Sequence, residues 1–196
     1  MTSQKRDFWV PSSEEVQEEM QRIKSQGRFS QALKSTFGTV IVVAAIAVLV
    51  AAIFLPVLRI TGTSMEPQFM PGDILVAYKT DNLKRGEICT FYYNNKLIVK
   101  RVIALGGDTV NISEDGLVSV NGNELNEPYV QKNALGLCDL EFPFEVPLGQ
   151  MFLLGDNRET SVDSRSTDFG CISVEEVLGK VFLRVWPFNT FRFYGL

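Results

Sequence analysis

Ile60-Thr61-Gly62-Thr63-Ser64-Met65-Glu66-Pro67 separates two parts of this 196-residue chain that have different sequence patterns. Upstream lies a long hydrophobic run without a charged residue. Downstream lie short runs rich in Val, Ile, Phe and Tyr, separated by turn residues. The first pattern predicts a long apolar helix and the second predicts β-strands. The chain is therefore expected to change from helix to sheet at this stretch, and Ser64 within it is the candidate nucleophile.

The hydrophobic run predicts a membrane anchor over residues 37–58. No charged residue occurs between Ser35 and Leu58, and residues 40–55 are almost purely aliphatic. At about 1.5 Å per residue, a helix of this length can cross a hydrocarbon core of about 30 Å. A buried core helix is disfavoured because a chain this small cannot surround it with apolar partners. A cleaved signal peptide is disfavoured because the run is too long and follows a polar leader.

Residues 1–36 are predicted to be a cytoplasmic leader that is partly helical. Ser12 followed by Glu15 three residues later is typical of a helix start. The residues that approach the hydrophobic run are basic: Arg22, Lys24, Arg28 and Lys34. The positive-inside rule therefore predicts a single pass through the cell (plasma) membrane, with the N-terminus in the cytoplasm and residues 59–196 outside. The lipid bilayer is accordingly an expected partner.

Residues 59–196 are predicted to be a mostly β extracytoplasmic catalytic domain of two curled antiparallel sheets. The candidate strands are residues 74–78, 88–93, 97–105, 109–112, 117–120, 151–154 and 180–186. Asn94-Asn95 and Asn121-Gly122 are turn signals between such strands. Only residues 174–178 have a helical pattern. Residues 123–149 are expected to form a loop-rich insertion, to which the sequence assigns no chemistry.

The composition excludes several kinds of site. The chain contains no histidine, so Ser-His-Asp and Cys-His catalysis and histidine-containing zinc sites are impossible. Any acid–base chemistry near neutral pH must use another side chain with a shifted pKa. The net charge of −4, without a basic stripe, gives no reason to expect a nucleic-acid partner.

The three cysteines are Cys89, Cys138 and Cys171, and no two of them have the spacing of metal ligands. They are expected to be packing residues, and a bridge between Cys138 and Cys171 remains an open alternative. A nucleophilic thiol is disfavoured because no histidine is present to lower its pKa.

A serine hydroxyl needs a base within hydrogen-bond reach, and lysine can be that base only when its amine is neutral. The lysine pKa must then fall several units from about 10.4, which desolvation in an apolar pocket can achieve. Lys100 fits this requirement because it lies in the apolar stretch Leu97-Ile-Val-Lys-Arg-Val-Ile-Ala-Leu105. Strand alternation puts Lys100 on one face with Ile98 and Val102. The alternative interpretation is a lysine that protects an edge strand from aggregation.

A third stretch, Gly155-Asp-Asn-Arg-Glu-Thr-Ser-Val-Asp-Ser-Arg165, is dense in polar residues. Asp163 and Arg165 are positioned to pair across a turn, and Ser161 is positioned to orient a neighbouring amine. A charged surface loop is the plain alternative. A divalent-metal site built from three aspartates is disfavoured because Arg158 and Arg165 would compete for their carboxylates. Those three aspartates are Asp156, Asp163 and Asp168.

Four stretches in this order resemble the motif boxes of bacterial type I signal peptidases. They are Thr61-Gly-Thr-Ser-Met-Glu-Pro67, Gly72-Asp-Ile-Leu-Val76, Lys100-Arg-Val-Ile-Ala-Leu-Gly-Gly-Asp108 and Gly155-Asp-Asn-Arg followed by Ser161 and Asp163-Ser-Arg165. The resemblance covers roughly residues 56–188. It includes Asn121-Gly-Asn-Glu-Leu-Asn-Glu-Pro-Tyr129 and Val185-Trp-Pro-Phe188.

The resemblance implies a membrane-bound serine endopeptidase that removes signal peptides from secreted preproteins after small residues, at sites of the Ala-x-Ala type. It makes Ser64 the nucleophile and Lys100 the general base, with no cofactor and no metal. Ser161 would orient the lysine amine, and Asp163 would form a structural ion pair with Arg165.

The resemblance also implies an oxyanion hole and substrate pockets. The Ser64 backbone N–H would be one oxyanion donor. Some family members supply a second donor from a hydroxyl at the position of Gly62, which has no side chain to do so. The substrate pockets would be apolar, with Ile60, Met65, Ile98 and Val102 as candidate lining residues.

Two other interpretations remain open from the sequence. One is a catalytically idle, anchored binding or scaffolding subunit, which the intact Ser64 and Lys100 disfavour. The other is a self-cleaving Ser/Lys repressor of the SOS type. The membrane span and the absence of a DNA-binding helix pair disfavour that one.

Overall fold

The computed structural model describes residues 12–194, and within α1 the side chains of residues 23–33 are not included. Contacts divide the chain after Ala51 into two compact units, each of which is described by itself. Residues 1–11 of the predicted leader lie outside the described residues.

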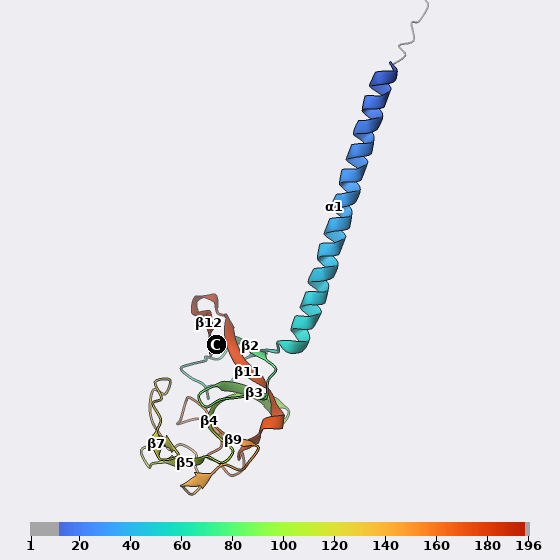
Figure 1. Ribbon diagram of the computed structural model, residues 1–196. Helices are drawn as coiled ribbons and strands as arrows, with labels where there is room; N and C mark the ends of the chain where they lie inside the picture. The colour runs from blue at the N-terminus through green and yellow to red at the C-terminus, as the bar shows by residue number, and fades with distance from the viewer. Residues whose placement is uncertain (1–11, 195–196) are drawn as a thin grey trace, which may run out of the picture. The chain divides into compact units, whose positions relative to one another are not determined.

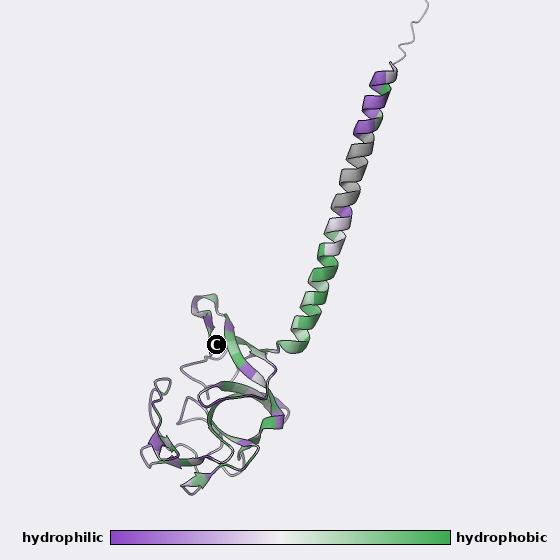
Figure 2. Ribbon diagram, in the orientation of Figure 1, coloured by the Kyte–Doolittle hydropathy of each residue, from purple (hydrophilic) through white to green (hydrophobic). Residues whose placement is uncertain are grey.

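The N-terminal unit is built on one helix, α1 (Ser13–Phe54). Its start has the predicted capping box, since the Ser12 N–H donates to Glu15 Oε2 at 2.9 Å and the Glu15 N–H donates to Ser12 Oγ at 3.3 Å. From Lys34 to Phe54 the helix is long and apolar enough to cross a membrane. Figure 2 shows α1 changing from hydrophilic at its start to hydrophobic further along the chain. This continuous apolar surface is consistent with a membrane anchor.

The apolar helix is shorter than the predicted anchor. Helix α1 ends at Phe54, and residues 57–58 belong to strand β1 (Val57–Arg59), in which Leu58 is buried. Pro56 explains the break, because it has no N–H to continue the helix and disfavours helical geometry in the residue before it. Because the hydrophobic run continues through residues 57–58, the sequence pattern did not reveal the change from helix to strand.

The larger sheet of the second unit is antiparallel, and Figure 1 labels most of its strands. Its strands are β1, β2 (Ile74–Tyr78), β3 (Ile88–Tyr93), β4 (Lys96–Leu105), β9 (Gln150–Leu154), β10 (Ile172–Ser173), β11 (Val177–Trp186) and β12 (Arg192–Phe193). The order is β1-β2-β11-β3-β4-β9-β10, and β12 pairs with β11. Strand β4 is thus an interior strand between β3 and β9.

The smaller sheet has the order β7-β6-β5-β8, and Figure 1 shows β5 and β7 well away from β2 and β11 within this unit. Its strands are β5 (Thr109–Ile112), β6 (Val118–Val120), β7 (Asn123–Glu124) and β8 (Phe144–Glu145). The predicted turns occur with positive φ, at Asn94 and Asn95 between β3 and β4 and at Asn121 between β6 and β7. The predicted mostly β class with antiparallel sheets is confirmed.

Strands β2 to β6, β9 and β11 were predicted closely, whereas the shortest elements were not. The expected helix over residues 174–178 is wrong: a single 3₁₀ turn, η1 (Val174–Glu176), is capped by Ser173 and leads into β11. Val177 pairs with Phe91 of β3, so sheet pairing replaces the second helical turn. The remaining 3₁₀ turn is η2 (Phe188–Thr190). The two-residue strands β7, β8, β10 and β12 were not predicted, because alternation needs a longer run.

The core places β4 at the meeting point of three apolar clusters. Val99 packs with Leu58 and Leu75, and Val102 packs with Phe91 and Leu153. Further along, Ile103 and Ala104 pack toward the smaller sheet. A side chain in the middle of β4 is therefore surrounded by packed apolar residues.

Candidate active site

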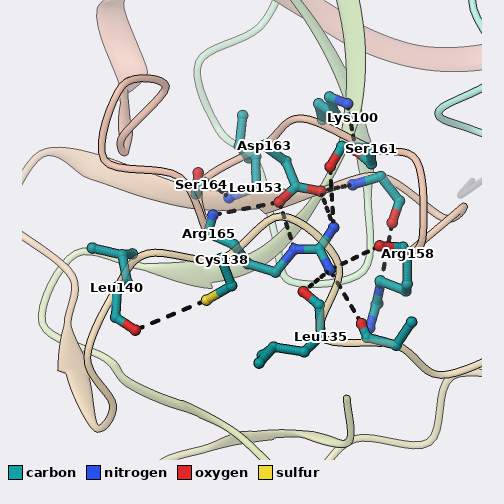
Figure 3. A network of polar contacts seen from close by, with 12 residues as sticks. Lys100, Leu135, Cys138, Leu140, Leu153, Arg158, Ser161, Asp163, Ser164 and Arg165 are labelled. Carbon is teal, nitrogen blue, oxygen red and sulfur yellow. Dashed lines mark hydrogen bonds and ion pairs between the residues drawn. The ribbon is translucent and has the colours of Figure 1, made fainter. Parts of the chain in front are cut away.

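Lys100 is buried in the middle of β4, with 2% of its surface exposed. Because β4 has a neighbour on each side, the interpretation of Lys100 as the protector of an edge strand is wrong. Its Nζ donates a hydrogen bond to Ser161 Oγ at 2.7 Å (Figure 3). The structure thus brings together the candidate base and the serine expected to orient it.

Burial lowers the pKa of Lys100 from 10.5 to about 8. The charges of Asp163 and Asp156 oppose this change, and the charge of Arg165 adds to it. With a pKa of about 8, about a tenth of the Lys100 amines are neutral at pH 7, against fewer than about one in 1,000 for an exposed lysine. Lys100 is therefore able to accept a proton near neutral pH.

Ser64 lies in a turn that follows β1, and two buried side chains hold this turn in place. Met65 and Phe69 belong to the apolar cluster under β1 and β2, and the Phe69 N–H donates to the Met65 carbonyl at 2.8 Å. Ser64 itself is half-buried. The packing of its neighbours fixes the backbone of the serine while its side chain remains partly accessible.

Asn157 joins the Ser64 turn to the Gly155–Arg165 loop. Its backbone N–H donates to the Ser64 carbonyl at 3.0 Å, and its side-chain Nδ2 donates to the Thr63 carbonyl at 3.3 Å. The Gly155-Asp-Asn-Arg stretch includes Asn157, yet the sequence pattern assigned it no role. A residue that acts through a contact with a distant backbone leaves no local pattern to read.

Gly155 fills the narrow space between the Ser64 turn and Ser161. A Cβ atom at this position would lie 2.2 Å from Ser161 Oγ and 2.5 Å from the Ser64 carbonyl oxygen. Both distances are far shorter than van der Waals contact, so only glycine fits without movement of one partner. Ser64, Gly155, Ser161 and Lys100 therefore form one contiguous group.

Replacing Gly155 with alanine is expected to reduce peptide cleavage at least about 100-fold, because the added methyl group pushes the serine turn and the lysine apart. The measurement is kcat/KM of the full chain in detergent. Gly38→Ala is the matched control, since nothing lies within 4 Å of a Cβ at that position. Wild-type activity in Gly155→Ala would contradict this account of the group.

Asp163 and Arg165 form a buried ion pair directly beside this group. Arg165 donates to both carboxylate oxygens, at 2.8 and 2.9 Å, and also to the carbonyls of Leu135 and Arg158 (Figure 3). The remaining approach to Asp163 Oδ2 is taken by the Gly155 N–H at 3.0 Å. Because both partners are fully buried and well bonded, the pair anchors the loop that carries Ser161.

A groove of about 520 Å³ opens beside Ser64. Of the four predicted pocket residues, Ile60, Met65 and Ile98 line it, whereas Val102 does not. Val102 is wholly buried opposite Leu153 of β9. The groove therefore does not extend along β4 as far as Val102. Gly62 also lines the groove, and so does Val99, which the sequence pattern did not single out.

Two of the three aspartates considered as metal ligands are paired with arginines. Asp156 binds Arg101 and Asp163 binds Arg165, so two of the three carboxylates already have cationic partners. Among the described residues 12–194, no three His, Cys, Asp or Glu side chains are grouped to hold a metal ion.

The three cysteines are free thiols, so the possible bridge between Cys138 and Cys171 is not formed. Burial raises the pKa of Cys89 to about 12 and of Cys171 to about 11. Both thiols are therefore protonated near neutral pH, which suits packing residues better than nucleophiles.

A β-rich unit that follows one apolar helix in the sequence, with a serine turn joined to the loop that contacts a buried lysine, is the arrangement expected of a serine peptidase. The sequence profile of one such family, described as "Signal peptidase, peptidase S26", matches residues 33–186. The chain therefore belongs to this family and is a serine peptidase hydrolase.

Several characterised proteins are similar to this chain. Signal peptidase I of Bacillus licheniformis is 36% identical over 166 residues, which are 78% of this chain and 88% of that protein. Signal peptidase IB of Staphylococcus aureus (strain MRSA252) is 36% identical over 154 residues, covering 68% and 79%. The crystal structure of a signal peptidase I from Enterococcus faecalis V583 is 31% identical, with a TM-score of 0.42, and the match covers 50% of this chain and 96% of that one.

Proposed function

We propose that this protein is a membrane-bound endopeptidase that removes N-terminal signal peptides from exported preproteins, with Ser64 as nucleophile and Lys100 as general base. The observation that carries the proposal is the buried Lys100 amine, whose pKa is lowered to about 8 and which Ser161 holds beside the Ser64 turn. The similarity to signal peptidases supports the choice of substrate.

In this mechanism the neutral Lys100 amine accepts the Ser64 hydroxyl proton as Oγ attacks the scissile carbonyl. Among the hydrogen bonds of residues 12–194, none uses the Ser64 N–H as donor, which leaves this group available for the oxyanion. Protonated Lys100 then gives its proton to the departing amine, and water hydrolyses the acyl-enzyme by the same route in reverse. Ser161 keeps the lysine amine oriented throughout.

The groove beside Ser64 suits an extended peptide with small side chains before the scissile bond. Ile60, Met65, Ile98 and Val99 give it apolar walls, and Arg59 and Lys96 add positive charge. Apolar walls favour small aliphatic groups over charged ones. We therefore assign Ala-x-Ala sites to this groove.

The expected membrane topology fits such a substrate. Ser64 follows Phe54, the last residue of α1, by ten residues. The basic residues before the span favour an N-terminus in the cytoplasm. The catalytic unit would then be extracytoplasmic, close to the lipid surface in which a signal peptide is also embedded. We also propose that the two antiparallel sheets are curled, as the sequence leads us to expect.

The test is cleavage of a purified precursor that carries an Ala-x-Ala site by the full chain in detergent, with the product mass giving the bond cut. We expect cleavage after the second alanine and no cleavage of a matched precursor with phenylalanine at that position. Cleavage elsewhere would overturn the specificity, and no cleavage of either precursor would overturn the proposed function.

Metal chelators are expected to leave cleavage unchanged, within about 10%, since neither the base nor the oxyanion donor in this mechanism is a metal ligand. The measurement is precursor cleavage after prolonged dialysis against a chelator. Loss of activity that added zinc or magnesium restores would contradict the Ser/Lys mechanism.

A further inference from the structure

A short segment between β7 and β8 contacts the Gly155–Arg165 loop through the side chain of Glu127. Glu127 accepts hydrogen bonds from both terminal nitrogens of Arg158, at 2.9 and 2.6 Å. The two side chains are almost inaccessible, with 6% and 1% of their surfaces exposed. A bidentate pair between a guanidinium and a carboxylate fixes the orientation of both groups as well as their separation.

Tyr129, two residues further on, extends this contact to β4. Its hydroxyl donates to Glu127 at 2.8 Å, and its ring lies 3.7 Å from the guanidinium carbon of Arg101. Arg101 is the neighbour of Lys100 in β4, and it also binds Asp156 at 2.8 and 2.6 Å. Glu127 and Tyr129 therefore hold arginines from both elements that carry the candidate site.

Arg158 connects this pair of residues to the catalytic group. Its Nε donates to the Gly155 carbonyl at 3.1 Å, and its own carbonyl accepts from Arg165 at 2.9 Å (Figure 3). Gly155 lies between the Ser64 carbonyl and Ser161, where the space is too narrow for a Cβ atom. Arg158 therefore holds the carbonyl side of Gly155, whose N–H is held by Asp163.

We propose that Glu127 and Tyr129 are positioning residues of the peptidase site, which hold Arg158 and Arg101 so that Gly155 keeps Ser64 and Lys100 in register. The catalytic part of this inference rests on the proposed function, whereas the part that concerns backbone order rests on the contacts alone. Residues 123–149, to which the sequence assigned no chemistry, thus include two residues that support catalysis.

The charges explain why Glu127 matters. Arg101 and Arg158 are balanced by Asp156 and Glu127 within one buried region. Asp156 lies close enough to Arg158 for their charges to interact. Without the Glu127 charge, Arg158 is expected to turn toward Asp156 and to release the Gly155 carbonyl, because an unpaired buried guanidinium is costly.

The first test is amide hydrogen exchange of the full chain in detergent. In Glu127→Gln and Tyr129→Leu, peptides covering residues 155–161 are expected to exchange at least about tenfold faster, because the N–H groups of Gly155, Asn157 and Ser161 lose their fixed acceptors. Peptides from β5 and β6 serve as the internal reference. Glu124→Gln, an exposed acid on β7, is the matched control, and Tyr129→Phe keeps the ring over Arg101.

The second test is precursor cleavage by the same variants, normalised to folded protein. We expect kcat to fall at least about tenfold in Glu127→Gln with KM within about twofold, and Tyr129→Phe to keep more activity than Tyr129→Leu.

Wild-type exchange at residues 155–161, or an equal increase in β5 and β6, would overturn the proposal. Faster local exchange with unchanged kcat would overturn the catalytic part. If the wild type cleaved no precursor, the proposed function would fall while the exchange data still decided the structural part.

Discussion

Replacing Ser64 with alanine is expected to reduce precursor cleavage to background, a loss of at least about 1,000-fold in kcat/KM. The reason is chemical, since alanine has no oxygen with which to form the acyl-enzyme. The rest of the site should persist, because the contacts that hold this turn involve the Ser64 carbonyl, Met65 and Phe69 rather than the Ser64 hydroxyl. The measurement is initial rate against enzyme concentration with the full chain.

A matched serine variant separates loss of the nucleophile from general damage. Ser119 lies on β6 of the smaller sheet, and Ser119→Ala is expected to keep cleavage within about twofold. Both variants should also unfold at the wild-type temperature. Substantial cleavage by Ser64→Ala would show that another residue is the nucleophile.

Replacing Lys100 with methionine is expected to abolish cleavage, by at least about 1,000-fold, and at the same time to stabilise the protein. Methionine fills a similar volume in the apolar surroundings of β4 but cannot accept a proton. The lowered pKa means that folding disfavours the charged form of Lys100. The difference from 10.5 to about 8 corresponds to a cost of about 3 kcal/mol at pH 7, which Lys100→Met removes.

The sign of this effect follows from proton linkage. Below pH 8 the unfolded chain holds the Lys100 proton more tightly than the folded chain, so the full cost is present. As pH rises above 10.5, the amine is neutral in both states and the cost disappears. Denaturant unfolding at pH 7 and at higher pH measures the difference. Lys84→Met, at an exposed lysine, is the control, and a destabilised Lys100→Met would contradict this account.

The sequence was most informative where a pattern was long. Strands β2, β3 and β5 have their predicted bounds, and Lys100 stood out because a charged residue interrupts an apolar strand. The order of the motif boxes was sufficient to predict the family. The contact between Lys100 and Ser161 was also predicted, although the two residues are 61 positions apart in the sequence.

What the sequence did not reveal depends on contacts between distant residues. Strand β1 continues a hydrophobic run, so only its pairing with β2 separates it from the helix. The role of Asn157 arises from bonds to the backbone of Thr63 and Ser64. Glu127 pairs with Arg158 from an irregular region without periodicity. None of these contacts follows from local spacing.

An absence of cleavage would have a specific meaning. If wild type, Ser64→Ala and Lys100→Met all failed to cleave the precursor, the interpretation as an anchored binding or scaffolding subunit would be favoured. Cleavage by the wild type and by Lys100→Met, but not by Ser64→Ala, would leave a serine peptidase whose base is another residue.

The most direct test of Lys100 as the base is the pH dependence of kcat/KM for the wild-type chain, which reports the pKa of the free enzyme. Activity should rise about tenfold per pH unit from about pH 6 and reach half its maximum near pH 8, as Lys100 loses its proton. A midpoint in this range would support the neutral amine as the proton acceptor. A plateau that extends unchanged to mildly acidic pH would contradict it.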